Sequence, residues 1–135
     1  MRWERAYPPE DEQAAAARRD ADRELATTGV VERVREDALI VVGELVTNAI
    51  RHAATEFTLA IDISAERVRV EVGDRDTRPP VLVAADVDAT SGRGLVLVAA
   101  VASAWGFETA DHDGVAGKTV WAEVPREGDA ERAGG

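Results

Sequence analysis

The segment Gly43-Glu-Leu-Val-Thr-Asn-Ala-Ile-Arg-His52 decides the fold that we predict for this chain. At about 100° per residue, a helix through it gathers Glu44, Asn48, Arg51 and His52 on one side. The other side is apolar and carries Ala38, Leu39, Val42, Leu45, Val46, Ala49, Ile50 and Ala53. The pattern therefore predicts an amphipathic helix, from about residue 31 to residue 53, with one face on a hydrophobic core.

The polar side of this helix has two interpretations. The simpler one is a solvated surface face. The functional one starts from Asn48, because asparagine is a poor helix former and its amide oxygen is a ligand that Mg²⁺ accepts. Glu44 lies one turn earlier, where its carboxylate could take a proton from water or from a hydroxyl group. The spacing puts both side chains within reach of one ligand.

The segments around this helix predict an α+β domain. An Ala-rich helix is expected over residues 9–28, closed by Gly29, and a short apolar helix over residues 94–103. Strands are expected at residues 2–7, 57–63, 68–72, 106–110 and 118–124, with Ser64–Arg67 as a hairpin connection and residues 74–91 as a long loop. This order predicts a two-layer α/β sandwich, in which a mixed, mostly antiparallel sheet carries helices on one face. The domain would span residues 1–125, followed by a disordered tail at residues 126–135.

Composition excludes several classes of function. The chain has 135 residues, enough for one domain with one core. Its net charge of −10 argues against binding to nucleic acid or to an anionic membrane, since both need a basic surface. Without cysteine it has no disulfide, zinc–thiolate site or thiol catalyst. No apolar run follows the first residues, and none is long enough to span a bilayer, so we expect a cytoplasmic protein.

Two further segments offer groups for a nucleotide. Asp74 ends an alternating strand, where its carboxylate could accept a hydrogen bond from an exocyclic amine such as that of adenine; a simple turn is the alternative. Thr90-Ser-Gly-Arg-Gly-Leu95 runs into an apolar helix, where glycines and free N–H groups favour phosphate and Arg93 adds a cation. An ordinary capped loop would look similar. Lys118 stands in Gly-Lys-Thr, but without the preceding glycine that a Walker loop requires.

Taken in order, these segments resemble the N, G1 and G2 boxes of the GHKL ATPase/kinase superfamily. The boxes correspond to Glu44–His52, to Val72-Gly-Asp74 and to Gly92-Arg-Gly94-Leu95. The chain looks most like the stand-alone histidine-kinase-like ATP-binding proteins related to anti-sigma-factor serine kinases. Its first strand and its last strand, Gly117–Pro125, are also similar to that branch, so the resemblance covers residues 1–125.

The resemblance implies a Bergerat-type α/β sandwich that holds ATP between sheet and helices, under a lid formed by residues 74–91. It implies that Asn48 ligates Mg²⁺, that Glu44 is the general base or positions water, and that Asp74 binds the adenine amine. The remaining implied nucleotide neighbours are Gly92, Arg93, Gly94 and Leu95 at the phosphates, Thr119 near the adenine, and Arg51 and His52 at the end of the N box. Two positions depart from the family pattern, because Asp76 and Ser91 stand where glycines are usual.

The resemblance suggests three functions. The leading one is an anti-sigma-type regulator: a serine/threonine protein kinase that phosphorylates a small antagonist, sequesters a sigma factor or similar protein, and forms homodimers like its relatives. The two departures favour an alternative, a non-catalytic module whose protein binding depends on ATP. A sensor kinase domain fits less well, because no helical hairpin with a phospho-acceptor histidine precedes the N box.

Overall fold

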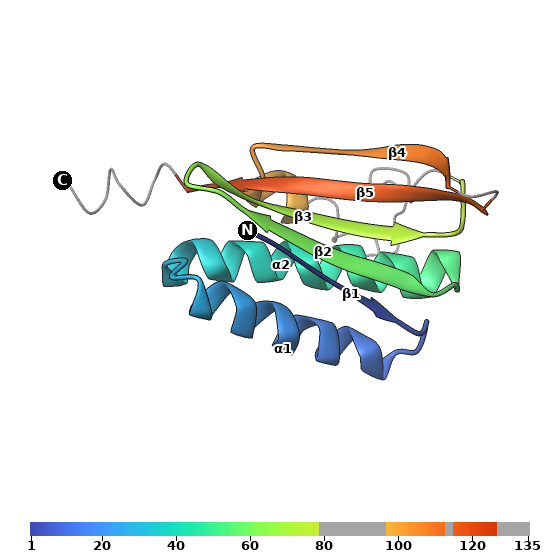
Figure 1. Cartoon of the computed structure of the whole chain (residues 1–135), viewed down its shortest axis with the longest axis horizontal. Helices are drawn as coiled ribbons and strands as arrows, with labels where there is room; N and C mark the ends of the chain where they lie inside the picture. Colours follow the sequence, from blue (N-terminus) through green and yellow to red (C-terminus); the bar gives the residue numbers. More distant parts are fainter. Residues whose placement is uncertain (79–96, 113–114, 127–135) are drawn as a thin grey trace.

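The computed structural model describes residues 1–78, 97–112 and 115–126, and the side chains within them except at residues 110–112 and 115. The elements, in chain order, are β1 (Arg2–Tyr7), α1 (Glu12–Thr27), α2 (Glu32–Asn48), η1 (Ala49–Ala53), β2 (Phe57–Ile63), β3 (Arg67–Asp74), β4 (Ala104–His112) and β5 (Val115–Pro125) (Figure 1). Residues 97–101 form a further short helix.

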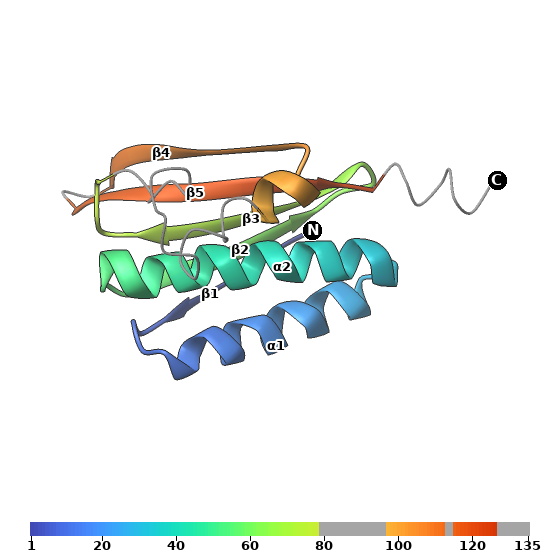
Figure 2. The ribbon, with the colours of Figure 1, turned by 180° about the vertical axis from the view of Figure 1, so that it is seen from behind.

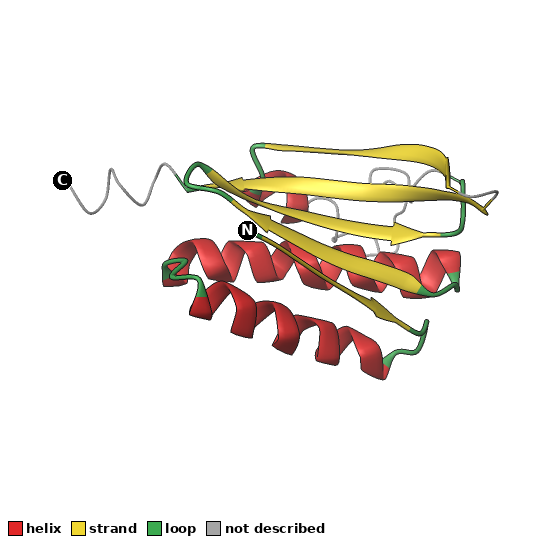
Figure 3. Cartoon of the chain, viewed as in Figure 1, coloured by secondary structure: helices red, strands yellow, loops and turns green. Residues whose placement is uncertain are grey.

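The five strands form one sheet in the order β1-β2-β3-β5-β4. All four neighbouring pairs are antiparallel. Helices α1 and α2 lie together against one face of this sheet, which Figures 2 and 3 show as two layers. The predicted α+β sandwich with helices on one face is therefore confirmed, and the described strands contain no parallel pair.

The core lies between the sheet and α2. Strands β3 and β5 bury alternate residues, namely Val68, Val70 and Val72 on one and Val120, Ala122 and Val124 on the other. Helix α2 covers them with Val34, Ala38, Val41, Val42, Leu45 and Val46. Helix α1 adds a stripe of Ala17, Ala21 and Leu25, spaced one turn apart. Small and β-branched side chains thus fill a core that contains few aromatic rings.

The structure shifts several predicted boundaries. Helix α1 begins at Glu12 rather than near Pro9, and it ends as expected at Gly29, whose φ of +79° is left-handed. The Gly29 N–H bonds the Ala26 carbonyl and the Val30 N–H bonds the Leu25 carbonyl, which is the Schellman pattern of helix ends.

The C-terminal half of the chain also differs in detail. The last helical segment ends at Val101 rather than at Ser103, because the Ser103 N–H already bonds the Glu123 carbonyl as the chain enters β4. Its predicted first residues, 94–96, lie outside the described part of the chain. Strands β4 and β5 are both longer than expected. Arg126, which was predicted to begin the tail, donates to the Ser64 carbonyl at 2.8 Å. Residues 79–91 of the predicted loop and residues 127–135 of the predicted tail lie outside the described part of the chain.

The outer face of the sheet, away from the helices, carries charged side chains from neighbouring strands. Arg69 forms ion pairs with Glu71 at 2.8 Å and with Glu123 at 2.9 Å. Its guanidinium also lies 4.3 Å from the ring centre of Trp121. No helix in the described part of the chain is long and apolar enough to cross a membrane.

A buried tyrosine ties β1 to α1. The Tyr7 side chain stacks on Phe57 with ring centres 5.4 Å apart, and its hydroxyl donates to the Asp20 carboxylate at 2.6 Å. Burial and this hydrogen bond raise the pKa of Tyr7 well above its ordinary value. The stabilisation from this group is therefore complete below the unfolded-state pKa of about 10 and is lost as the pH rises above it.

We expect Tyr7→Phe to lower the free energy of unfolding near neutral pH by about 1–3 kcal/mol, because a hydrogen bond to a charged acceptor is lost. The variant should also lose the part of the alkaline decline that begins near pH ~10. Urea unfolding of both proteins across this range measures these effects. Tyr7 is the only tyrosine, so phenolate absorbance reports its ionisation alone, and ionisation of the folded chain at an ordinary tyrosine pKa would contradict the prediction.

Candidate functional site

The polar side chains of α2 lie near the end of the helix. Glu44 and Asn48 are both half-buried, one turn apart, and Asn48 is the last residue of α2. Neither side chain has a hydrogen-bond or ion-pair partner among the described residues. The carboxyl-terminal ends of α2 and β3 and the beginning of β5 lie at the same end of the sandwich (Figure 1). Asn48, the last residue of α2, and Asp74, the last residue of β3, therefore lie toward the same end of the sandwich.

The helix changes its winding directly after Asn48. The prediction of one continuous helix to Ala53 is wrong in this last turn, because residues Ala49–Ala53 form a π-helix. The Ala54 N–H bonds the carbonyl of Ala49, five residues earlier, at 3.1 Å, and Ala54 ends the turn with a left-handed φ of +54°. Such wide turns are often found at functional sites. The extra residue per turn rotates the side chains after Asn48 away from the positions that a regular helix would give them.

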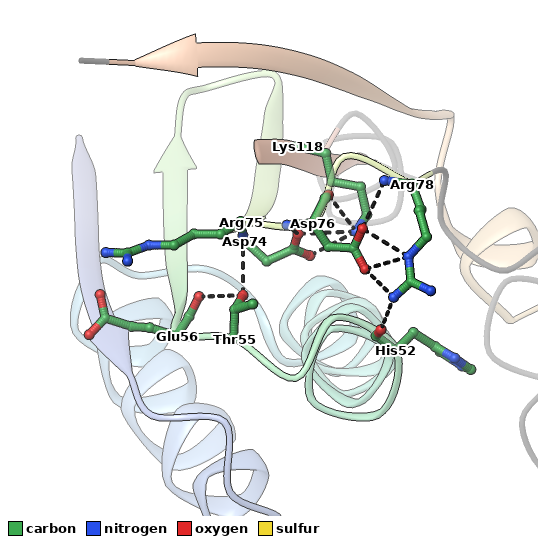
Figure 4. A network of polar contacts seen from close by, with 8 residues as sticks. All are labelled: His52, Thr55, Glu56, Asp74, Arg75, Asp76, Arg78 and Lys118. Atoms are coloured by element: carbon green, nitrogen blue, oxygen red, sulfur yellow. Dashed lines mark hydrogen bonds and ion pairs between the residues drawn. The ribbon is translucent and has the colours of Figure 1, made fainter. Parts of the chain in front are cut away.

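Arg51 and His52 lie within this π-helical turn, beyond the end of α2. Arg51 is exposed and lines a surface hollow of about 310 Å³ between the start of α1 and the end of α2, together with Asp11, Ala14, Thr47 and Ile50. The His52 ring points away from the polar network at the end of β3, and its carbonyl faces that network instead (Figure 4).

Asp74 lies at the centre of that network. It continues the buried alternation of Val70 and Val72, so its carboxylate faces the helices. Lys118, its direct partner on β5, places Nζ 3.1 Å from Oδ1 and 3.0 Å from Oδ2. Oδ1 also accepts the N–H of Asp76 at 2.8 Å. The Asp74 carboxylate is therefore buried, ion-paired and held by three contacts (Figure 4).

Asp76, which stands where the family pattern has glycine, has a structural role of its own. Its carboxylate accepts one bifurcated hydrogen bond from the Nε–H of Arg78, at 3.0 Å to Oδ1 and 2.8 Å to Oδ2, and one from the backbone N–H of Arg78 at 2.9 Å. These bonds hold the pKa of Asp76 well below its ordinary range. The same guanidinium donates to the His52 carbonyl at 2.9 Å. The segment after β3 is thus fastened to the end of η1.

Gly117 lets β5 pass very close to Asp74. A Cβ atom at this position would collide with the backbone oxygen of Asp74 and would lie 3.3 Å from Cα of Arg75. Only glycine fits here without moving the backbone that carries the Asp74 carboxylate. The first two residues of the motif Gly117-Lys-Thr therefore both act on Asp74: Gly117 allows the close approach of its backbone, and Lys118 forms the ion pair with its carboxylate.

Thr119, by contrast, lies on the other face of the sheet. Its neighbours Lys118 and Val120 are buried toward the helices, and Thr119 faces Gly73 across the ladder on the opposite side. The residue that accompanies Asp74 is Lys118, which sequence reasoning considered only as a Walker lysine. The available signal was its position, since Lys118, Val120, Ala122 and Val124 alternate along one apolar strand face.

The remaining site residues predicted from sequence lie outside the described part of the chain: Gly92, Arg93, Gly94 and Leu95. The described residues contain no group of three or more His, Cys, Asp or Glu side chains that could hold a metal ion. A half-buried amide oxygen such as that of Asn48 still suits Mg²⁺, because this ion often takes few protein ligands and fills its remaining positions with phosphate oxygens and water.

Comparisons with known proteins identify a family model and solved structures of similar fold. A model of the family described as histidine kinase-like ATPase domain matches residues 7–123. The solved structure of the RsbU and RsbW domains of Rv1364c from Mycobacterium tuberculosis has a TM-score of 0.67 and 19% identity, over 93% of this chain and 33% of that one. A chain in the SiaB–SiaC complex from Pseudomonas aeruginosa has a TM-score of 0.65 and 15% identity, over 90% and 89%. No curated protein sequence matches.

These findings agree with the resemblance read from the three boxes. The chain spans about a third of the first solved structure and most of the second, and at such low identity both show a shared fold. The family model extends over most of the chain, from the end of β1 into β5. The chain therefore belongs to the family of histidine kinase-like ATPase domains.

Proposed function

We propose that this chain is an ATP-binding regulator that transfers phosphate from Mg²⁺-ATP to a serine or threonine of a small antagonist protein. The observation that carries the proposal is that α2, which ends at Asn48 and carries Glu44 one turn earlier, and β3, which ends at Asp74, end at the same end of the sandwich (Figure 1). Neither Glu44 nor Asn48 has a side-chain partner among the described residues. The amide oxygen of Asn48 is suited to bind a cation, the carboxylate of Glu44 to accept a proton, and the carboxylate of Asp74 to accept a hydrogen bond from a base amine.

Each residue has a distinct role in the proposal. The amide oxygen of Asn48 would hold Mg²⁺, which supplies charge neutralisation at the phosphates. Asp74 would accept a hydrogen bond from the adenine amine. Glu44 would take the proton from the attacking hydroxyl, while the new O–P bond forms and the bond between the γ-phosphorus and the ADP oxygen breaks. Gly92, Arg93, Gly94 and Leu95 would line the phosphates.

A protein partner is part of the proposal. The family match and the likeness to the RsbW domain and to a chain of the SiaB–SiaC complex support a regulator that acts through another protein. The net charge of −10 suits a partner with a basic surface, such as an antagonist or a sigma factor, and does not suit nucleic acid. We further propose a cytoplasmic protein that forms homodimers.

Two observations favour a second candidate, a non-catalytic module in which ATP only controls protein binding. The Asp74 carboxylate is already paired with Lys118, and Asp76 replaces a glycine of the family pattern. Both features would weaken nucleotide binding without preventing it. The two candidates share ATP binding and differ in whether ADP is formed.

Calorimetric titration with Mg²⁺-ATP tests the common claim. We expect wild type to bind, and Asn48→Ala to bind at least about tenfold more weakly, because a direct ligand of the ion is removed. The loss should shrink when the titration uses ATP with a chelator in place of Mg²⁺. Thr47→Ala, on the neighbouring half-buried position, is the matched control and should bind like wild type. A wild-type chain that gives no heat would overturn the proposal.

A further inference from the structure

Lys118 is an unusual residue for this chain. Of sixteen basic residues, fifteen are arginine, so Lys118 is the only lysine. It is also the only basic side chain among the buried residues of the described part of the chain. The Lys118 side chain is 5% exposed to solvent, and the Asp74 side chain is 2% exposed. The single lysine is therefore placed on the helix-facing side of the sheet, against the carboxylate that we propose for base recognition.

The hydrogen-bonding capacity of the ammonium group is filled. Nζ donates to both oxygens of Asp74 and to the carbonyl of Asp76, at 3.2 Å. An ammonium group has three donors, and each has an acceptor here. Asp74 in turn accepts hydrogen bonds from Nζ on both of its oxygens and from the Asp76 N–H on Oδ1. Nζ thus lies in front of the carboxylate and contacts both of its oxygens.

A base amine that takes the position of Nζ in front of Asp74 would displace this ammonium group. The amine of adenine is neutral, and its hydrogen bond to a carboxylate is weaker than that of a charged donor. A lysine can move aside more readily than a residue with a rigid side chain, because its charge sits on a flexible four-carbon stem. The carbonyl of Asp76 remains available to hold Nζ after it leaves the carboxylate.

We propose that Lys118 competes with the nucleotide base for Asp74, and that it thereby sets both the affinity for nucleotide and the preference for a base that carries an amine. This inference rests on the proposed function, in which Asp74 binds the adenine amine. In the free chain Lys118 holds the carboxylate in place of the base. When Mg²⁺-ATP binds, Nζ leaves Asp74 and the base amine takes its position.

Calorimetry on Lys118→Met tests the competition. Methionine keeps the length of the side chain and removes the charge, so Asp74 is left open to the base. We expect Mg²⁺-ATP to bind at least about tenfold more tightly to the variant than to wild type, because no ion pair has to be broken. Mg²⁺-ITP, whose base has an oxygen in place of the amine, should not share this gain.

Arg67→Met is the matched control. It removes one positive charge at the far end of β3, where Arg67 is half-exposed and pairs with Glu123 at 3.3 Å. Loss of a positive charge from a protein of net charge −10 weakens the binding of an anion in general. The control should therefore bind ATP as wild type does or slightly more weakly, and tighter binding by Lys118→Met cannot come from net charge.

A spectroscopic measurement on the wild-type chain covers the case in which Lys118→Met does not fold. With isotope-labelled lysine, the side-chain ammonium gives a single NMR signal, because the chain has one lysine. We expect this signal to shift on saturation with Mg²⁺-ATP, and to stay in place with Mg²⁺-ITP bound. An Nζ signal that does not move at saturating Mg²⁺-ATP would contradict the proposal.

The outcomes separate this inference from the proposed function. If wild type binds Mg²⁺-ATP and Lys118→Met binds equally or more weakly, the competition is refuted and the proposed function stands. If wild type gives no heat with Mg²⁺-ATP and Lys118→Met binds it, the competition is supported, because the site is then closed by its own lysine, and the proposed function of the wild-type chain is overturned. If neither protein binds nucleotide, and the Nζ signal does not respond, the proposed function fails and the inference fails with it.

Discussion

We expect Asp74→Ala to lower the free energy of unfolding by about 3–5 kcal/mol, because it leaves a buried ammonium group without its counter-charge. Lys118 would keep one contact, to the carbonyl of Asp76, where it now has three. Urea unfolding at neutral pH, followed by the fluorescence of the three tryptophans, measures the change. The same variant should not bind Mg²⁺-ATP detectably, because the proposed acceptor for the base amine is gone.

The double variant Asp74→Ala/Lys118→Met shows whether the cost arises from the stranded charge. Replacement of a whole buried ion pair by apolar groups is often neutral, so this protein should recover most of the lost stability while remaining unable to bind ATP. Asp62→Ala is the matched control, since Asp62 is half-exposed and pairs with Arg2 at 3.6 Å. It should cost about 1 kcal/mol or less. If the Asp74→Ala protein is as stable as the Asp62→Ala protein, the buried Asp74–Lys118 pair contributes no more to the free energy of unfolding than an exposed pair does.

The helix with Glu44 and Asn48 could be predicted because its pattern is local. An apolar residue every three or four positions fixes which side of α2 faces the core, and the unmatched polar residues then mark the other side. The pattern carries no information on the change of winding after Asn48. The end of η1 is also held by a hydrogen bond from Arg78 to the His52 carbonyl, which joins positions 26 residues apart and leaves no trace in the local pattern.

Lys118 illustrates a different limit. The alternation in β3 and in β5 predicts two strands, but the ladder that sets Asp74 opposite Lys118 joins residues 44 apart. The sequence of either strand alone does not show that β5 lies between β3 and β4, and it does not show the register in which β5 pairs with β3. A lysine on the apolar face of a predicted strand indicates that a buried counter-charge exists, and only the pairing of strands identifies it as Asp74.

The fold itself explains why the candidate site is placed where it is. One end of the sandwich collects the last turn of α2, the end of β3 and the glycine-linked start of β5 (Figure 1). These elements contribute different polar groups. The helix carries the amide of Asn48 and the carboxylate of Glu44, β3 carries the carboxylate of Asp74, and β5 carries the ammonium group of Lys118. The carboxylate of β3 is neutralised by Lys118, whereas Glu44 has no described cationic partner. This difference supports the role of general base that we propose for Glu44.

We expect Glu44→Gln to reduce phosphate transfer by about 10²–10⁴-fold, the range that general-base catalysis contributes, while Mg²⁺-ATP still binds within about threefold of wild type. Glutamine keeps the size and the hydrogen-bonding oxygen of glutamate and cannot take the proton. Radiolabelled ATP gives two readouts: ADP formation by the chain alone, with water as acceptor, and label transferred to candidate antagonist proteins. Both should fall together if one base serves both acceptors.

Glu36→Gln separates the loss of the base from a loss of charge on α2. Glu36 is an exposed glutamate on the same helix, two turns before Glu44. Its replacement changes the net charge equally and should leave binding and transfer as in wild type. If Glu44→Gln transfers phosphate as fast as this control, Glu44 is not the base. If wild type binds Mg²⁺-ATP but forms no ADP and labels no antagonist, catalysis is excluded, and the chain is better described as a non-catalytic binding module. Glu44, which is half-buried and has no partner among the described residues, would then only orient water around the bound nucleotide.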